Sequence, residues 1–540
     1  MTRLRLLGVG LALVMAAWGQ GGRNAAGRGA PGGAAAGAQT GGRAGRGAEA
    51  GTTAVPAAGG ALDFYNYDPS AGTSLPISDA PAAETHQKIT VGGQTLAYTA
   101  HAGFLPLRNA TSGTVEAHVF YTFYAKDGEG AGRPVMFFFG GAPGVSAAWQ
   151  EFGGLGPKRM EGSAWADNPQ TLLSAADLVF VNPVGTGYSR PDRPERATAF
   201  WNTAADTASM GEFVRSFLGR YDRRMSPLYL AGEDWGTGRV AGLAGYLNDH
   251  NVAVHGVVLL SVTEAADALA GDTQYMTLLP SLVMAAWHHK KLTPELNAMS
   301  SEQIAGEARK FASREYLHAL YKGDRMTADE RAKSLADMSR LTGLGKQFLI
   351  SNEFRVTLDR FNSELLHEQH RGLSPSDARV AGFVPPAQFG GRGGGGGFGF
   401  GAPPPPTDFR LSILGASFAT AYEAYVRKEL TFGGAANEIF YLNSGGVGTY
   451  TSTGNDDGAL ATAFSKNPNL KMFVAVNYFD LNAPFYATEY TVAHLNVSPE
   501  VRGKNITVTH LEAGGMPYLD TKALGKLHND LAGFVSGGAK

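Results

Sequence analysis

Residues 230–238, Leu-Ala-Gly-Glu-Asp-Trp-Gly-Thr-Gly, decide the fold of this chain. A short apolar run leads into Gly232, Gly236 follows, and a helical pattern covers residues 239–248. A strand, a sharp glycine turn and a helix make a nucleophile elbow, whose central side chain projects above a sheet at a helix N-terminus. That central residue is usually serine, whereas here it is Asp234. Taken alone, the pattern also fits an ordinary helix start, because aspartate is favoured beside free N–H groups there.

Short apolar runs that end in glycine or polar loops recur on both sides of this turn. They are residues 135–139, 178–181, 228–230, 257–260, 440–442, 472–476 and 506–509. Helical stretches separate several of them, and apolar strands that alternate with helices indicate a parallel sheet covered on both faces. The predicted fold is therefore α/β, with a mostly parallel central sheet flanked by helices.

A helical block interrupts this series of strands and divides the predicted core. The block covers residues 265–410 and is expected to be a cap, inserted between core segments at residues 61–264 and 411–540. Within the first core segment, residues 86–126 alternate between polar and apolar side chains over several runs. This alternation predicts an antiparallel meander at the edge of the sheet.

The cap carries two helix-start signals and one low-complexity stretch. Ser300 with Gln303, and Thr327 with Glu330, are capping-box patterns. Residues 389–406 contain a glycine run and then four prolines, which predicts a flexible surface loop.

The N-terminus carries the pattern of an export signal. Arg3 and Arg5 precede an apolar run at residues 6–17, and small residues follow it. The run is shorter than the ~20 residues that span a bilayer, which favours a secretory signal peptide at residues 1–19. Residues 20–60, rich in Gly, Ala and Arg, are expected to form a disordered spacer. We therefore expect a periplasmic or extracellular protein with no stable membrane span after signal cleavage.

Composition excludes several classes of function. The 540 residues carry a formal net charge of −2, which gives no basic footprint for nucleic acid. The absence of cysteine excludes disulfides, thiolate metal sites and a cysteine nucleophile. His367 and His370 stand three positions apart, not the four of a zinc helix motif. We expect no cofactor, no metal and no nucleic-acid partner.

Five segments resemble the motifs of the serine carboxypeptidase family, in the same order along the chain. They are residues 139–149 (Phe-Gly-Gly-Ala-Pro-Gly-Val-Ser-Ala-Ala-Trp), 180–189 (Phe-Val-Asn-Pro-Val-Gly-Thr-Gly-Tyr-Ser), 232–236 (Gly-Glu-Asp-Trp-Gly), 478–485 (Tyr-Phe-Asp-Leu-Asn-Ala-Pro-Phe) and 511–516 (Leu-Glu-Ala-Gly-Gly-Met). The family carries Asn-Gly-Gly-Pro-Gly-x-Ser in the first, Gly-Glu-Ser-Tyr-Gly in the third and Ala-Gly-His-Met in the last. The resemblance covers roughly residues 62–535 and implies an α/β-hydrolase fold with a cap.

The resemblance implies an exopeptidase with a serine, histidine and aspartate triad. Carried over by position, Asp480 is the retained acid, Asp234 replaces the serine and Gly515 replaces the histidine. Serine attack needs a hydroxyl and a base that takes its proton, and neither is present at these positions. The family's oxyanion hole uses backbone N–H groups at the positions of Ala142 and Trp235.

The resemblance also implies that half of the substrate-carboxylate clamp is missing. The family holds the substrate carboxylate with an asparagine, here Gly140, and with the glutamate of the elbow, here Glu233. A carboxylate at the elbow also places negative charge where a tetrahedral oxyanion would develop. We therefore expect a catalytically inactive homologue that binds a peptide-like or small ligand in the ancestral cleft.

Three alternatives remain open from the sequence. The protein could be an active family carboxypeptidase, a purely structural surface protein, or a rewired hydrolase in which Asp234 is the covalent nucleophile. The rewired site still needs a histidine to activate water. His510 is expected on the opposite face of its strand, and His288 or His289 would have to reach over from the cap.

Overall fold

The computed structural model describes residues 81–141, 143–384, 408–436, 438–443, 450–451 and 458–538. The predicted signal peptide, the predicted spacer, the loop at residues 389–406 and Ala142 lie outside the described residues. All described residues fall in one compact unit, residues 65–540.

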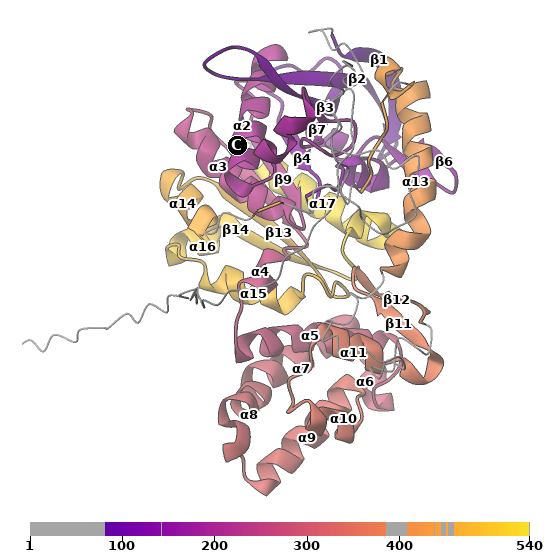
Figure 1. The fold of residues 1–540 in the computed structure, drawn as a ribbon, viewed down its shortest axis with the longest axis vertical. Helices are drawn as coiled ribbons and strands as arrows, with labels where there is room; N and C mark the ends of the chain where they lie inside the picture. Colours follow the sequence, from indigo (N-terminus) through magenta and orange to yellow (C-terminus); the bar gives the residue numbers. More distant parts are fainter. Residues whose placement is uncertain are drawn as a thin grey trace, which may run out of the picture. The chain divides into compact units, whose positions relative to one another are not determined.

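The central sheet confirms the predicted α/β fold (Figure 1). Its strands lie in the order β1 (Ala83–Val91), β2 (Gln94–Arg108), β3 (Val115–Lys126), β7 (Asp177–Val181), β4 (Val135–Phe139), β9 (Leu228–Glu233), β10 (Gly256–Leu260), β13 (Lys471–Asn477) and β14 (Ile506–Leu511), with β8 (Arg190–Pro191) paired to β3. The strands from β7 to β14 pair in parallel, whereas β1, β2 and β3 form the predicted antiparallel meander.

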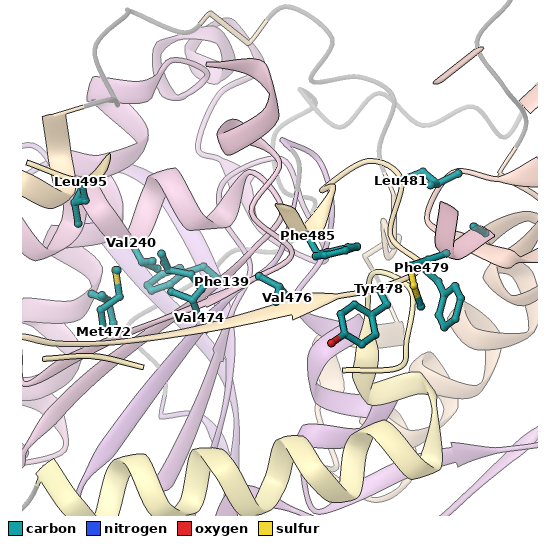
Figure 2. Close-up of a cluster of buried hydrophobic side chains, with 14 of the residues drawn as sticks. Phe139, Val240, Met472, Val474, Val476, Tyr478, Phe479, Leu481, Phe485 and Leu495 are labelled. Carbon is teal, nitrogen blue, oxygen red and sulfur yellow. The ribbon is translucent and has the colours of Figure 1, made fainter. Parts of the chain in front are cut away.

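Successive side chains of the parallel strands enter two separate cores. Phe137 of β4 and Val474 of β13 pack on one face, while Phe138 and Phe473 pack on the other. Both faces are buried because helices cover both, which explains why these strands read as continuous apolar runs. Figure 2 shows Val474 among the buried side chains of the first core.

Helices on either face of the sheet supply the rest of the two cores. The first face is covered by α2 (Thr203–Arg220), α3 (Gly236–Asp249), α14 (Ala459–Lys466) and α15 (Phe485–His494), and the second by α1 (Ala148–Gln150), α13 (Phe409–Lys428) and α17 (Thr521–Gly538). A small hairpin of β5 (Lys158–Glu161) and β6 (Ala164–Asp167) and the helix α16 (Pro499–Asn505) complete the core.

The inserted cap begins after β10 and is mostly helical, as predicted. Its helices are α4 (Glu264–Asp267), α5 (Asp272–His288), α6 (Pro294–Asn297), α7 (Ser301–Phe311), α8 (Leu317–Lys322), α9 (Ala328–Thr342), α10 (Lys346–Ser351) and α11 (Leu358–Glu364). Both predicted capping boxes form, at the starts of α7 and α9. Figure 1 shows α5 to α11 grouped together on one side of the core.

Two sequence predictions about local structure were wrong. The cap ends in an antiparallel hairpin, β11 (Arg371–Ser374) and β12 (Asp377–Phe383), which the helical prediction missed. Residues 440–442 are not a strand and make only the isolated bridge between Tyr441 and Gly187. Their apolar side chains are buried beneath α13, so burial and not sheet pairing explains the pattern.

Among the described helices, none is both long enough and apolar enough to cross a bilayer.

Candidate active site

Asp234 lies at the sharp corner between β9 and α3, where the sequence places it. Its φ of 53° is left-handed, which is strained for a residue with a side chain. Its N–H donates to the carbonyl of Leu260 on the neighbouring strand at 3.0 Å, and its carbonyl accepts from the Thr237 N–H at 3.0 Å. The half-buried Asp234 side chain therefore occupies the position of the nucleophile in an elbow.

Two glycines make this corner possible because other backbone approaches them closely. A Cβ on Gly232 would stand 2.0 Å from the carbonyl oxygen of Gly236. A Cβ on Gly236 would stand 2.7 Å from the carbonyl oxygen of Gly140, at the end of β4. Both distances are far below van der Waals contact, so the turn needs glycine at both positions.

Asp480 lies in the loop that follows β13 and faces Gly515. Its Oδ1 accepts N–H groups from Asn482 at 3.0 Å and Ala483 at 3.1 Å. A Cβ on Gly515 would stand 3.0 Å from its other oxygen, Oδ2. A side chain at position 515 would therefore meet the Asp480 carboxyl group, as a triad histidine must.

The turn of the β11–β12 hairpin packs against this pair of loops. The carbonyl of Ser376 accepts the Gly515 N–H at 2.7 Å, and the carbonyl of Pro375 accepts the Leu481 N–H at 2.9 Å. The Ala378 N–H donates to the carbonyl of Phe479 at 2.8 Å. The cap thus holds both loops by main-chain hydrogen bonds at the place where the family carries its acid and its histidine.

Gly514 leaves no room for a side chain beneath this turn. A Cβ there would stand 2.4 Å from the Ser376 carbonyl oxygen and 2.5 Å from the Asp377 Cβ. We expect Gly514→Ala to lower the free energy of unfolding by about 1–3 kcal/mol, because the turn must shift. Urea unfolding measures this loss, with Gly503→Ala, where a Cβ meets no atom within 4 Å, as the control. Equal stability of the two variants would contradict the packing.

Arg410 is a buried side chain of α13 that sequence reasoning missed. Its Nη1 donates to the carbonyl of Gly515 at 2.6 Å and lies 3.4 Å from the Asp377 carboxylate. Asp377 also pairs with Arg379 at 2.8 Å. The guanidinium of Arg410 therefore links the hairpin turn to the Gly515 loop. No motif signal marks Arg410, because it follows the low-complexity loop in the chain.

The acidic residues around the elbow share a dry environment. Burial, with Asp234 and Asp480 nearby, raises the pKa of Glu233 to about 8, although the Tyr518 hydroxyl donates to its Oε2 at 2.6 Å. Burial and Asp234 raise the pKa of Asp480 to about 7 against the lowering effect of the Ala483 N–H. Glu233 and Asp480 are only 3% and 2% exposed. At pH 7 Glu233 is therefore mostly a neutral acid.

Further polar groups at the strand ends join this site, and sequence reasoning missed them. Ser261 follows β10 at a φ of 52°, and its hydroxyl lowers the pKa of Asp480 against the effect of burial. The side-chain amide of Asn477 donates to the Ser261 hydroxyl at 2.8 Å. Their positions at the ends of parallel strands are a signal that could have found them, because ligands bind at that edge of a sheet.

The clamp position Gly140 cannot hold the asparagine of the family without a rearrangement. A Cβ on Gly140 would stand 2.5 Å from the Val145 carbonyl oxygen and 2.8 Å from the Ala147 N. The carbonyl of Gly140 accepts a hydrogen bond from Arg239 Nη1 at 3.1 Å, and Arg239 pairs with the buried Asp206 at 2.6 Å. The segment after β4 is therefore fixed in a form that excludes the clamp side chain.

Trp235, one of the two oxyanion-hole positions, directly follows Asp234. Ala142 lies outside the described residues, but its neighbour Gly141 is so close that a Cβ there would stand 3.5 Å from Asp234 Oδ2. Trp235 begins α3, and its half-buried ring packs edge-on to Tyr450 with centroids 6.2 Å apart. The Asp234 carboxyl group thus lies close to Gly141 and directly precedes Trp235.

The candidate histidines are engaged by other groups. His510 Nε2 lies 2.6 Å from Glu489 Oε1 of α15. The His510 side chain therefore lies on the face of β14 that contacts α15, and His510 is a strand residue, as predicted. His289 Nε2 contacts the carbonyl of Ala378 at 2.7 Å. His288 packs on Phe479 and is half buried. The hairpin explains their burial, since it packs against the end of α5.

Neither metal nor zinc-motif chemistry finds support in the described part of the chain. No three described His, Cys, Asp or Glu side chains gather as a ligand set there. His367 and His370 lie in and after a short 3₁₀ turn, exposed to solvent.

Comparisons with known proteins match part of this chain to one protein family. A family model described as serine carboxypeptidase matches residues 92–339. Two relatives from Arabidopsis thaliana are serine carboxypeptidase-like 36, 28% identical over 130 residues, and serine carboxypeptidase-like 34, 26% identical over 159 residues. The matched segments cover 23% and 27% of this chain, and only 27% and 29% of the length of those relatives.

Solved structures with a similar arrangement are hydrolases of low sequence identity. An open-form lipase is 12% identical, covers 82% of this chain and 99% of its own, and has a TM-score of 0.33. A haloalkane dehalogenase variant from Bradyrhizobium elkanii is 13% identical, covers 84% and 97%, and has a TM-score of 0.28. Residues 92–339, slightly less than half of the chain, are thus similar to the serine carboxypeptidase family.

Proposed function

We propose that this protein is an exported, catalytically inactive serine carboxypeptidase homologue that binds a peptide-like or small ligand at the elbow. The observation that carries the proposal is the pair formed by Asp480 and Gly515. A Cβ at position 515 would stand only 3.0 Å from Asp480 Oδ2, and position 515 has no side chain. With Asp234 at the elbow, the site lacks both the hydroxyl and the base of acyl transfer.

The same site favours some ligands over others. Asp234 and Trp235 are both half-buried and therefore reachable from solvent, whereas Glu233 and Asp480 are not. A free C-terminal carboxylate would meet the Asp234 carboxylate and would lack the asparagine of the clamp. The ligand is therefore a peptide-like molecule whose contact group is neutral or cationic. The protein binds it without releasing its C-terminal residue.

Calorimetry and mass spectrometry together test this proposal. A pool of amidated peptides is expected to give binding heat with the purified chain while every peptide keeps its mass. Asp234→Asn should weaken the binding, whereas Asn251→Asp, at another left-handed position in the loop after α3, should leave it unchanged. Shortening of any peptide by its last residue would refute inactivity.

Mass spectrometry of the intact protein distinguishes the rewired-hydrolase alternative from this proposal. An ester formed on Asp234 would add the mass of the substrate fragment to the intact protein. Because His510 and His289 are held by Glu489 and Ala378, no histidine would activate water to cleave this ester, so an adduct would accumulate. An inactive homologue should form no adduct with ester, epoxide or haloalkane probes. A trapped adduct on Asp234 would replace the proposal with covalent catalysis.

A further inference from the structure

A second cavity, separate from the elbow, lies at the open edge of the central sheet. Its volume is about 520 Å³, and its lining comes from β14, from the start of α7 and from α17. This size is within the range of sites that hold small molecules or short peptides, about 300–1,000 Å³. The proposed function at Asp234 makes no use of it.

The floor of this cavity is an edge strand. β14 is at the end of the sheet and pairs with β13 alone among the described strands. The Leu511 carbonyl accepts the Tyr478 N–H at 3.0 Å, so Leu511 and Thr509 turn their main-chain groups toward β13. In a parallel pair the alternate residues, Val508 and His510, then turn their N–H and C=O groups away, toward the cavity. Such an edge is a template for an added strand.

Contacts between the core and the cap hold one wall of the cavity in place. Arg309 of α7 makes hydrogen bonds to Glu489 of α15 at 2.9 Å and shorter. The other carboxylate contact of Glu489 is the ring of His510 at 2.6 Å. These three side chains connect α7, α15 and β14, so the edge strand and the wall beside it are rigid relative to each other.

The charges along the cavity leave one acidic group uncompensated. The Glu512 carboxylate pairs with Lys522 at 3.2 Å, and Lys526 pairs with Asp530 at 2.5 Å. Glu302, in the first turn of α7, is exposed and takes part in no ion pair within the described residues. The unbalanced charge is therefore negative, at the end of the cavity where β14 finishes.

We propose that an extended peptide with a free amino terminus adds to β14 as an antiparallel strand, with its ammonium group beside Glu302. The main-chain groups of Val508 and His510 supply the hydrogen bonds. The direction follows from the charge, because an antiparallel strand begins where β14 ends, next to Glu302. The start of α7 and the lysines of α17 border the edge on two sides, which favours a single peptide strand over the sheet of a second copy.

The probe for this site is the pentapeptide Ala-Thr-Val-Thr-Val with a fluorophore on its C-terminal amide, titrated with the full chain and followed by fluorescence anisotropy. N-acetylation removes the ammonium and should weaken binding about two- to five-fold, the usual effect of an exposed ion pair. Glu302→Gln should weaken binding of the free peptide by the same factor and leave binding of the acetylated peptide unchanged.

The main-chain hydrogen bonds have their own test. Val508→Pro removes an outward N–H without touching the ladder to β13 and should weaken binding about three- to ten-fold. Val508→Ala keeps that N–H and should bind like the wild-type chain. Amide exchange at His510 should slow when the peptide is present. Circular dichroism confirms that each variant is folded.

Three results would overturn the proposal. They are equal affinity for free and acetylated peptide, equal affinity of Val508→Pro and Val508→Ala, and a dimer in light scattering that excludes the peptide. Asp234→Asn should not change the anisotropy titration, so failure here leaves the elbow proposal standing, and the reverse also holds.

Discussion

The double variant Asp234→Ser/Gly515→His is expected to hydrolyse p-nitrophenyl acetate at least about 100-fold faster than the wild-type chain. The gain is the usual contribution of a positioned general base, about 10²–10⁴-fold. The base would lie beside Asp480, because a Cβ at position 515 would stand 3.0 Å from Oδ2, while Oδ1 is held by two N–H groups. The elbow itself already has the strained φ that presents a nucleophile.

Initial rates with the activated ester measure this effect, and each single variant is a control. Asp234→Ser alone lacks the base, and Gly515→His alone lacks the hydroxyl, so both should stay near the wild-type rate. Adding Asp480→Asn to the double variant should remove most of the gain. A double variant no faster than either single one would show that the Asp480 loop and the elbow do not form one site.

The same double variant is expected to remain unable to release C-terminal residues from peptides. Gly140 cannot carry the clamp asparagine, since a Cβ there would stand 2.5 Å from the Val145 carbonyl oxygen. Esterase activity without carboxypeptidase activity would therefore separate the lost chemistry from the lost recognition. Recovery of both would show that recognition of the carboxylate had survived without the asparagine.

Local sequence pattern was enough to predict the strand-to-helix corner and the core of the sheet. Gly232, Asp234 and Gly236 predict the corner because only glycine tolerates the close backbone contacts observed there. Continuous apolar runs predict strands that are covered on both faces. The structure has such strands, since their successive side chains are buried alternately in two separate cores.

The hairpin over the site could not be predicted in the same way. Residues 371–383 form the antiparallel pair β11–β12, but their pattern is short and follows a long helical block. Their role depends on contacts with Phe479, Leu481 and Gly515, more than 95 positions further along the chain. Contacts at that separation leave no periodic trace in one sequence.

Burial of Glu233 and Asp480 was likewise beyond local reasoning. The resemblance identified Asp480 as the retained acid, but nothing in its local sequence indicates that it is only 2% exposed. Its environment is set by Ser261 and the hairpin turn, which belong to other parts of the chain. Loops at the ends of parallel strands are buried here because the cap covers them.

The free energy of unfolding is expected to decrease as the pH rises from about 5 to about 8, at up to about 1.4 kcal/mol per pH unit for each buried acid. Burial, together with Asp234, raises the pKa of Glu233 from 4.5 to about 8 and that of Asp480 from 3.8 to about 7. Burial also raises the pKa of Glu151 from 4.5 to about 7, although the hydroxyls of Tyr124 and Tyr422 donate to it.

The direction follows from proton binding in the two states. Each of these acids has a folded-state pKa above its unfolded value, so in this window the folded chain holds protons that the unfolded chain has released. The stability linked to them is complete below the unfolded pKa and is lost as the pH rises through the folded pKa.

Urea unfolding at pH 5, 6, 7 and 8 measures this pH dependence of the free energy of unfolding. Glu151→Gln and Glu233→Gln should each reduce the slope, because a neutral amide no longer titrates, whereas Glu500→Gln at an exposed pair should not. An unchanged slope in Glu151→Gln and Glu233→Gln would mean that these carboxyl groups are ionised in the folded protein.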